Sequence, residues 1–260
     1  MSKCRVPNLV HFVYGMREDR SDRPFSLVHY VAFRSALETH GPARLVLHTG
    51  YVPAGPWWEA IAPHVQVRIV EVPTSIHGNT LDRPEHRSDI VRLDALLEFG
   101  GLYLDMDTIS VRPVDSLRHH RCVLGIESTP GTGSHGLSNA VVMAEPGSAF
   151  LQRWRAAYTS FNQDYWNTHS VVLPRLLAQQ APPGEVHAEP VESFHWPSWD
   201  ETGIRSMFEE SHDYPGAFVH HLWAGKTWKS HLAHFTLSSV WALDTTYNRL
   251  ARRYISKPLR

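Results

Sequence analysis

The sequence predicts an α/β fold, a Rossmann-like single domain whose mostly parallel central sheet is flanked by helices. Short apolar segments that indicate strands alternate along the chain with segments of helical periodicity, and this alternation is typical of parallel sheets. The chain has 260 residues, of which 42% are hydrophobic, which is enough to enclose one large core. We therefore expect residues 1–260 to form one domain.

The elements of the first half can be assigned from apolar spacing and turn formers. In order, we expect a strand at 6–14, a helix at 26–40, a strand at 44–48, a helix at 57–61, a strand at 65–72 and a helix at 84–99. The last of these is the most clearly marked, because Ile90, Leu93 and Leu97 recur at helical spacing before Gly100 and Gly101. Glycine ends helices readily, so a new strand should begin there.

The second half continues the alternation. We expect strands at 102–107, 122–126 and 139–144, followed by helices at 148–161 and 165–180. The segment 128–136 is dense in glycine, serine, threonine and proline, which favour turns over regular structure. It is therefore predicted to be a mobile loop, a candidate for a lid.

Two aspartates end the strand expected at 102–107. Asp105 and Asp107 are two positions apart, so in an extended strand both point to the same side, together with Tyr103. Leu102 and Leu104 then point into the core. Paired carboxylates suit a hard divalent cation, and α/β sheets place their ligands at the ends of their strands. The pattern predicts a metal site that neutralises a diphosphate.

The preceding helix adds an acid and a base to the same region. Asp89 and Arg92 are three residues apart on the helix at 84–99, which places them on one face. An exposed ion pair of this kind contributes under about 1 kcal/mol to stability. Because the helix leads directly into the strand with Asp105 and Asp107, we expect these charges to converge on one site.

These residues together resemble the core of the D-x-D sugar-binding glycosyltransferases of family 32, with the catalytic domains of the large clostridial glucosylating toxins as more distant relatives. The shared pattern is approximately S-D-x-x-R, a helix, and G-G-x-Y-x-D-x-D. The matching residues here are Ser88, Asp89, Arg92, Gly100, Gly101, Tyr103, Asp105 and Asp107. The resemblance implies a GT-A-type fold and a catalytic centre that includes Asp89, Arg92, Asp105 and Asp107. It also implies contacts with the nucleotide sugar by Ser88, Asp89, Arg92, Tyr103 and Asp105.

The segment 6–15 resembles the opening strand of that family, I-P-K-x-I-H-F-x-W-x-G. Tyr14 stands in the place of the usual tryptophan. In the toxins this aromatic residue stacks on the nucleotide base, and Tyr14 still offers a flat ring. The resemblance implies that Phe12, Val13 and Tyr14 border the nucleotide.

The segment 219–228 is similar to the closing motifs of the family, H-x-W-x-x-x-S and H-H-W-A-G-S-W. One residue of this motif usually completes the set of metal ligands. His220 and His221 are neighbours and point to opposite faces in an extended segment, so at most one reaches the metal, and the H-x-W register selects His221. Lys226 and Trp228 are implied to lie at the donor, with Lys226 near the departing diphosphate.

The resemblance implies a metal-dependent, retaining glycosyltransferase. Mn²⁺ or Mg²⁺ held by Asp105, Asp107 and His221 would stabilise the departing diphosphate while an acceptor hydroxyl approaches from the same side of the sugar. A UDP-sugar is the favoured donor, and the acceptor is expected to be a glycan, a lipid-linked molecule or a natural product, in polysaccharide biosynthesis. Asn139 matches a family residue beside the donor sugar, although an asparagine that opens a strand is as often a turn residue. Glu127 either faces the anomeric carbon or is a solvated carboxylate.

Two other functions remain open from the sequence. Residues 102–108 also resemble the haloacid-dehalogenase signature h-h-h-D-x-D-x-T, in which Asp105 would be the nucleophile of a Mg²⁺-dependent phosphatase. That fold also needs a later lysine and an acidic pair after an apolar strand, a pattern that the sequence does not show. An inactive sugar-binding module would keep the fold without the metal, but the intact Asp105 and Asp107 argue against it.

Composition limits the partners and the location. The formal net charge of -1 argues against a broad nucleic-acid-binding face. Cys4 and Cys122 are the only cysteines and lack metal-ligand spacing, so reduced thiols are expected. Most of the 18 histidines, His119 and His120 included, are expected at the surface or in hydrogen bonds. With no transmembrane segment or signal peptide visible, we expect a bacterial cytoplasmic enzyme that touches membranes only if its acceptor is lipid-linked. The oligomeric state is open.

Overall fold

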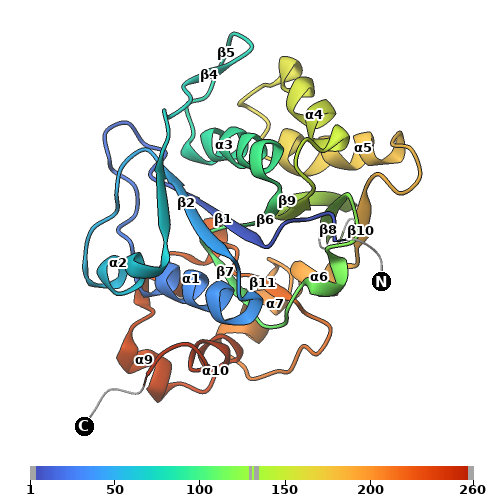
Figure 1. The fold of residues 1–260 in the computed structure, drawn as a ribbon. Coiled ribbons are helices and arrows are strands. Elements are labelled where there is room, and N and C mark those ends of the chain that lie inside the picture. Colours follow the sequence, from blue (N-terminus) through green and yellow to red (C-terminus); the bar gives the residue numbers. More distant parts are fainter. Residues whose placement is uncertain (1–3, 129–130, 132–134, 257–260) are drawn as a thin grey trace.

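A seven-stranded sheet in the order β10-β8-β9-β6-β1-β2-β3 forms the centre of the computed structural model, which describes residues 4–128, 131 and 135–256 (Figure 1). The strands are β1 (Leu9–Tyr14), β2 (Arg44–Thr49), β3 (Gln66–Ile69), β4 (Ser75–Ile76), β5 (Asn79–Thr80), β6 (Gly101–Leu104), β7 (Thr108–Ser110), β8 (Cys122–Ser128), β9 (His135–Ala144), β10 (His187–Glu189) and β11 (Val219–His221). Strands β4 and β5 form one small sheet, and β7 and β11 form another.

Helices and short helical turns cover the sheet. The α-helices are α1 (Leu27–His40), α2 (Pro56–Ile61), α3 (Pro84–Phe99), α4 (Ala149–Ala156), α5 (Leu173–Gln179), α6 (Val191–Phe194), α7 (Glu201–Phe208), α8 (Ala224–Thr227), α9 (Leu237–Ala242) and α10 (Thr246–Ala251). Shorter turns of 3-10 helix lie at Ala62–His64, Asp115–Leu117, Ala157–Ser160 and Leu232–His234, and a π-helix lies at Thr168–Val172.

The predicted α/β class is confirmed, because the central sheet is mostly parallel. Strand β1 pairs in parallel with β2 and with β6, β2 pairs in parallel with β3, and β8 pairs in parallel with β10. Only β9 runs antiparallel to its neighbours, β6 and β8. The alternation of strands and helices in the first half of the chain produces the parallel part.

The sheet separates two apolar layers, with α1 and α2 on one side and α3 and α4 on the other (Figure 1). Alternation along β6 contributes to both layers. Leu102 and Leu104 pack with Phe33 of α1, whereas Tyr103 packs on the opposite side with Leu93 of α3. The tyrosine that precedes the D-x-D motif therefore lies on the α3 side of the sheet.

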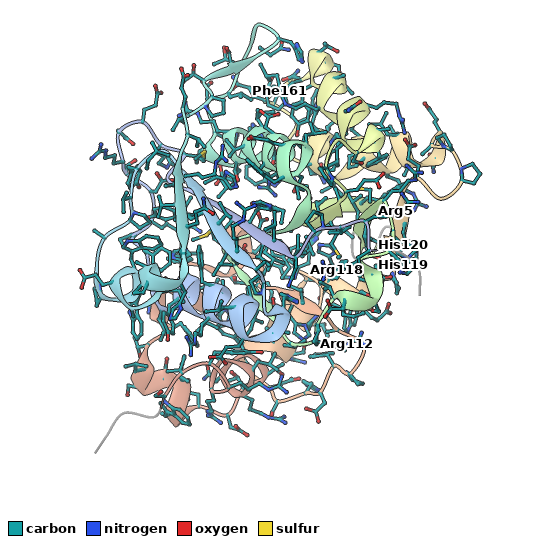
Figure 2. The ribbon with its side chains drawn as sticks, in the orientation of Figure 1. Arg5, Arg112, Arg118, His119, His120 and Phe161 are labelled. Atoms are coloured by element: carbon teal, nitrogen blue, oxygen red, sulfur yellow. The ribbon has the colours of Figure 1, made fainter. Side chains whose placement is uncertain are left out.

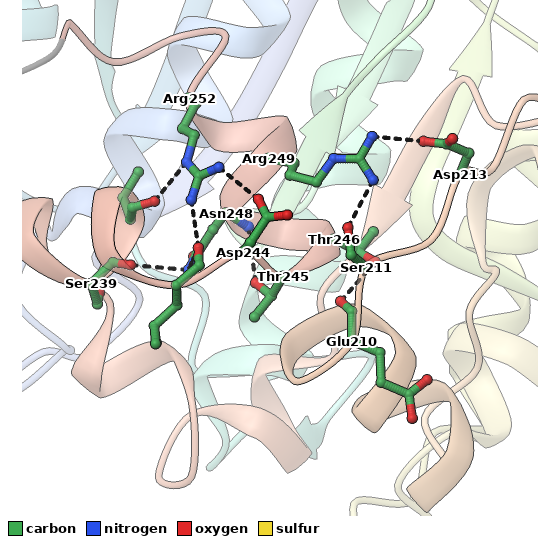
Figure 3. A network of polar contacts seen from close by, with 12 residues as sticks. Glu210, Ser211, Asp213, Ser239, Asp244, Thr245, Thr246, Asn248, Arg249 and Arg252 are labelled. Atoms are coloured by element: carbon green, nitrogen blue, oxygen red, sulfur yellow. Dashed lines mark hydrogen bonds and ion pairs between the residues drawn. The ribbon is translucent and has the colours of Figure 1, made fainter.

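The C-terminal segment forms a further layer against the outer face of α1. Val28 and Val31 of α1 share a buried cluster with residues of α7, α9 and α10. Figure 3 shows polar contacts that hold this layer together: Arg249 donates to Oγ of Ser211 at 2.8 Å and pairs with Asp213 at 3.1 Å. These contacts hold α10 against the segment that follows α7.

The strand expected at 102–107 is shorter than predicted. Strand β6 ends at Leu104, so Asp105 and Asp107 lie in the turn between β6 and β7 and not on a strand. At the start of β6, a Cβ atom on Gly101 would lie 2.7 Å from the carbonyl oxygen of Leu9, and φ is +114°. The glycine is therefore required both for the backbone turn and for the close approach of β1.

The helices expected at 148–161 and 165–180 are both interrupted. Helix α4 ends at Ala156 and continues as a 3-10 turn, while a π-helix precedes α5. Pro174 explains the second difference, because a proline lacks the N–H that a continuous α-helix from residue 165 would need at that position. Of the predicted loop at 128–136, residues 129–130 and 132–134 lie outside the described residues.

No helix within residues 4–128 or 135–256 has both the length and the apolar character that a membrane crossing requires.

Candidate functional site

A cleft of about 840 Å³ lies at the end of β6, between the N-terminal part of α3 and the segment that follows β11. The residues predicted from the D-x-D and S-D-x-x-R patterns all line it: Ser88, Asp89, Arg92, Tyr103, Asp105 and Asp107. Val13, Tyr14, Asn139, His221, Lys226 and Trp228 line it as well. The structure thus brings together nearly all of the residues that the sequence singled out.

Phe12 is the exception. Its side chain is fully buried and stacks on Phe33 with the ring centroids 4.1 Å apart. It does not line the cleft, because alternation along β1 turns it toward α1. The predicted contact of the Phe12 side chain with a nucleotide is therefore not seen.

Asp105, Asp107 and His221 form the one group of three such side chains among the described residues that has the spacing of a metal site. One potential ligand atom from each lies within 4.8 Å of the others. Nδ1 of His221 is buried and has no hydrogen-bonding partner among the described residues. Two carboxylates and an imidazole with a free lone pair fit a divalent cation such as Mg²⁺ or Mn²⁺.

The backbone after β11 holds Asp107 in place. Oδ2 of Asp107 accepts a hydrogen bond of 2.6 Å from the N–H of Ala224 and lies 3.3 Å from Nε2 of His221. Trp223 makes this geometry possible with a left-handed backbone at φ 57°, which costs about 1 kcal/mol or more for a residue with a side chain. Its indole N–H donates to the carbonyl of Pro197. A strained turn is thus fixed by contacts on both sides.

Arg92 connects the acids of α3 with those of the turn after β6. Its guanidinium lies 3.3 Å from Oδ1 of Asp89 and 3.0 Å from Oδ1 of Asp105. It also donates to the carbonyl of Asn139 and to both the carbonyl and the hydroxyl of Ser88. Because its N–H groups are engaged by protein atoms, Arg92 holds the two carboxylates in position.

Each of these carboxylates keeps one oxygen available to a ligand. On Oδ1, Asp89 also accepts a hydrogen bond of 2.7 Å from the Asn139 side chain, and Asp105 accepts one of 2.6 Å from Tyr103. Oδ2 of both aspartates has no hydrogen-bonding partner among the described residues. Tyr103 therefore supports the site from below. Its ring is buried, and the guanidinium carbon of Arg92 lies 4.5 Å from the ring centroid.

Burial and the neighbouring charges shift the pKa values of the three aspartates. Burial raises the pKa of Asp89 to about 6 against the opposing effect of Arg92. Burial and the neighbouring Asp107 also raise the pKa of Asp105. Burial alone would raise the pKa of Asp107 too, but His221 and the N–H of Ala224 lower it to about 2. A divalent cation between Asp105 and Asp107 would relieve their repulsion.

Glu127 at the end of β8 adds a further carboxylate. It lines the cleft, and burial raises its pKa while a hydrogen bond from Ser138 opposes the rise. His221 and Asp105 both act on its charge. Of the two readings of Glu127 that the sequence left open, the structure favours a residue that faces the site over a freely solvated one.

The opposite end of the cleft has an aromatic and basic character. Tyr14 meets His29 edge-on at 6.0 Å, and its hydroxyl donates to the carbonyl of Arg23. Trp228 stacks on His29 at 5.8 Å and carries the Arg23 guanidinium over its ring at 4.5 Å. Lys226 is exposed at the cleft, 5.3 Å from the Trp199 ring. Aromatic rings and cations of this kind suit a nucleoside diphosphate.

Sequence reasoning missed several cleft residues. They are Arg17, Asp22, Arg23, His29, Glu85, His86 and Trp166. Arg17, Asp22 and Arg23 lie in the irregular segment between β1 and α1, where no spacing pattern applies. His29 opens α1 as an ordinary helix residue, so only its burial beside Trp228 reveals it.

The remaining histidines support the expectation that most are not ligands. The rings of His119 and His120 are 3.9 Å apart, and His120 stacks on His187 at 3.9 Å. Figure 2 labels His119 and His120 at the edge of the molecule beside β10. His220 is buried and contacts the carbonyl of Trp196, facing away from His221 as their alternation on β11 predicts.

Comparisons with known proteins identify the family. A family model described as a glycosyltransferase sugar-binding region containing a DXD motif matches residues 58–124. Glucan organizing enzyme 1 of Cryptococcus neoformans var. grubii is 33% identical over 261 residues, which cover 96% of this chain and 71% of that protein.

Solved glycosyltransferases share the fold. The galactosyltransferase LgtC in complex with donor and acceptor sugar analogues aligns with a TM-score of 0.51 and 14% identity, covering 96% of this chain and 97% of that one. The apo-form glycosyltransferase GlyE of Streptococcus pneumoniae aligns with a TM-score of 0.55 and 13% identity, covering 95% of this chain and 63% of that one. At this identity the likeness concerns the fold, which is of the GT-A type as expected.

Proposed function

This chain belongs to the family of glycosyltransferases whose sugar-binding region contains a DXD motif, and we propose that it transfers a sugar from a nucleoside diphosphate to an acceptor hydroxyl with retention of the anomeric configuration. A UDP-sugar is the proposed donor. The observation that carries the proposal is the convergence of Asp105, Asp107 and His221 within 4.8 Å in a cleft that also holds Asp89. A phosphatase is not supported, because the matching family model and solved structures are those of glycosyltransferases.

A divalent ion, Mn²⁺ or Mg²⁺, held by Asp105, Asp107 and His221 would neutralise the charge that develops on the diphosphate. Arg92 holds Asp105 in a fixed orientation, and the N–H of Ala224 does the same for Asp107. These supports reduce the reorganisation needed when the ligands are engaged.

The sugar is proposed to lie against Asp89 and Asn139. Oδ2 of Asp89 is free to accept a hydrogen bond from a sugar hydroxyl. The nucleotide then extends toward Tyr14 and Trp228, where rings and the cation of Arg23 meet its base and phosphates. Lys226 would approach the diphosphate from the segment after β11.

In the proposed reaction the acceptor oxygen forms a bond to the anomeric carbon on the side from which the diphosphate departs. The bond between that carbon and the diphosphate oxygen breaks, its electron pair stays on the diphosphate, and the acceptor proton passes to the same oxygen. The carboxylate of Glu127 interacts electrostatically with His221 and Asp105. We propose that it orients the acceptor hydroxyl.

Donor hydrolysis tests the proposal directly. The protein is incubated with UDP-glucose, UDP-galactose, UDP-N-acetylglucosamine or GDP-mannose and Mn²⁺, and release of the nucleotide is measured with and without EDTA. We expect hydrolysis of one UDP-sugar that EDTA abolishes and that added Mn²⁺ restores. Hydrolysis that is insensitive to EDTA would refute the role of the metal, and phosphatase activity on simple phosphate esters would refute the reaction.

We also propose a biological setting. The name of the fungal relative refers to glucan, which supports a role in polysaccharide biosynthesis for this chain. The bacterial origin and the cytoplasmic location expected from the sequence stay predictions, as does the single domain over residues 1–260.

A further inference from the structure

The cleft has a third wall, which neither the nucleotide end nor the metal group uses. It is formed by residues 166–171, between the 3-10 turn after α4 and the helix α5. Trp166 is 54% exposed although it lines the cleft, and Asn167 and Ser170 line the cleft beside it. A large aromatic ring that stays exposed to solvent in a cleft gains little stability from burial. Contact with a bound molecule would explain its position.

The support beneath Trp166 is rigid. Its ring centroid lies 5.7 Å from that of His86, which in turn packs edge-on against Phe161 at 5.0 Å, and the guanidinium of Arg83 lies 5.4 Å from the indole. Phe161 is labelled in Figure 2. His86 is 2% exposed, and burial lowers its pKa, so it packs as a neutral ring. These contacts occupy part of the indole and leave the rest facing the cleft.

The buried imidazole gives an independent indication that a polar molecule binds here. Neither ring nitrogen of His86 makes a hydrogen bond of normal geometry among the described residues, although the backbone of Trp166 lies close enough to oppose the fall in its pKa. A buried polar group without a partner costs about 1–3 kcal/mol, and in a cleft wall a ligand hydroxyl or a water normally meets that need.

The position of Trp166 identifies the part of the substrate that it meets. His86 lies on α3, three residues before Asp89, and Val171 packs over Gly136 on β9, the strand that carries Asn139. The wall therefore adjoins the residues proposed to hold the donor sugar. The nucleotide end, with Tyr14 and Trp228, is built on β1 and on the segment after β11 instead.

Resting on the proposed function, we propose that Trp166 is the platform of the acceptor subsite and that the acceptor is a saccharide whose pyranose ring stacks on the indole. The apolar face of a pyranose matches an exposed aromatic ring, and its ring of hydroxyls matches the amide of Asn167 and the hydroxyl of Ser170. A membrane surface would favour a cluster of basic side chains around the ring, whereas this wall carries one base, Arg83, beside one acid, Glu85.

Tyr165 provides a matched control. It precedes Trp166 directly and is 62% exposed, yet it does not line the cleft. Trp166→Ala, Trp166→Phe and Tyr165→Ala are compared with the unchanged chain. Donor hydrolysis without acceptor is measured first, and transfer is then measured against increasing laminaripentaose, maltopentaose or mannopentaose, with the donor that the unchanged chain hydrolyses fastest.

We expect Trp166→Ala to raise the KM for the pentasaccharide about tenfold or more, as loss of a stacking ring does elsewhere, and Trp166→Phe to raise it less. Donor hydrolysis by both variants should stay within about twofold of the unchanged chain, because the metal and nucleotide residues are intact. Tyr165→Ala should change neither quantity. The melting temperature of each variant shows that it is folded.

The outcomes separate this inference from the proposed function. If no donor is hydrolysed by the unchanged chain, the proposed function is refuted and the inference with it. If the donor is hydrolysed but Trp166→Ala and Tyr165→Ala have the same KM for every pentasaccharide, the acceptor platform alone is refuted. The membrane alternative is tested with phosphatidylglycerol vesicles. If Trp166→Ala and Tyr165→Ala lose vesicle binding equally while their KM stays unchanged, the saccharide is overturned in favour of a membrane surface.

Discussion

Nε2 of His221 on β11 lies 3.3 Å from Oδ2 of Asp107 in the turn before β7, although the two residues come from distant parts of the chain. Strand β11 pairs with β7, which begins directly after Asp107, and this pairing sets His221 opposite Thr108. The backbone N–H of Leu222 also donates to the carbonyl of Asp107. The third member of the metal group is therefore delivered by a two-stranded sheet outside the central one.

Asp107→Asn should abolish transfer and leave the fold intact, because its carboxylate serves the cation and not the packing of the core. The measurements are Mn²⁺ binding by calorimetry, donor hydrolysis and the circular dichroism spectrum. Asp115→Asn is the matched control, since Asp115 is exposed and pairs only with Arg118 among the described residues. Near-normal turnover of Asp107→Asn would show that the metal assignment is wrong.

Some parts of this structure could be derived from the sequence because their signals are local. Helix α3 has the predicted bounds, since Pro84 opens it, its apolar residues recur at helical spacing and Gly100 ends it. The convergence of Asp89, Arg92 and Asp105 followed from the same signals, because one short turn joins α3 to β6. The position of His221 came from a motif resemblance, and the structure brings it to Asp105 and Asp107.

Other parts could not be derived because they depend on contacts between distant segments. Strand β7 has no pattern of its own and forms only through its pairing with β11. The engagement of Arg92 by Ser88 and Asn139 is set by the packing of α3 on β9, which no spacing in either segment encodes. Trp166 belongs to no motif in the sequence, and only its exposure in the cleft distinguishes it from the other tryptophans.

Tyr14→Ala should weaken UDP binding by about 1–2 kcal/mol if the ring stacks on the base as rings do at other nucleotide sites. Tyr14→Phe and Tyr14→Trp should keep most of the affinity. Titration calorimetry with UDP and Mn²⁺ measures the effect. The hydrogen bond from the Tyr14 hydroxyl to Arg23 is lost in Tyr14→Phe, so this variant also reports how much that bond contributes. Equal affinity of Tyr14→Ala and the unchanged chain would assign the ring to packing alone.

Asp89 should make the affinity for a UDP-sugar depend on pH. Its pKa is raised by burial to about 6, so its ionised form, the better acceptor for a sugar hydroxyl, is lost as the pH falls through about 6. The affinity for the UDP-sugar should fall over that range more steeply in the unchanged chain than in Asp89→Asn, which has no carboxylate to protonate. The ratio of the two dissociation constants is measured from pH 5 to 8, and a ratio that does not change would contradict the contact.

The same raised pKa has a consequence for stability. Because the pKa of Asp89 in the folded chain lies above its ordinary value of 3.8, its contribution to stability is complete below pH 3.8 and is lost as the pH rises through about 6. Asp89→Asn removes this buried charge. In the absence of ligands at pH 7.5, the variant should therefore melt no lower than the unchanged chain, while donor hydrolysis is lost. A clearly lower melting temperature would mean that the pair with Arg92 stabilises the fold.

Buried histidines should make the protein unstable in acid. Nδ1 of His11 lies 3.0 Å from Nε2 of His48, and burial lowers the two pKa values to about 4 and about 3. Both are below the ordinary value of 6.5, so their contribution to stability is complete above pH 6.5 and is lost as the pH falls toward these values. His48→Gln keeps a hydrogen-bonding group without the titration. Urea unfolding between pH 6.5 and 4 measures the effect. The free energy of unfolding of His48→Gln should decline less steeply than that of the unchanged chain, by about 1.4 kcal/mol per pH unit, because the variant takes up one proton fewer on unfolding.

The segment after β11 should become more ordered when nucleotide and metal bind, but only in part. Leu222 and Ala224 are already fixed by hydrogen bonds to Asp107, so the strand itself has little to gain. Gly225 and Lys226 are exposed at the cleft and lie at the tip of the segment. A cationic side chain that meets the diphosphate only in the bound state would draw this tip inward.

Hydrogen exchange across residues 218–230, with and without UDP and Mn²⁺, measures the closure. Protection should rise at 225–228 and remain constant at 219–222, where the pairing of β11 with β7 already protects the backbone. Gly225→Ala is an informative variant, because a Cβ there would meet no other atom within 4 Å, so it restricts the backbone without a clash. Equal protection at 225–228 in both states would refute the closure and leave the chemistry at Asp105 and Asp107 untouched, since those residues are positioned without it.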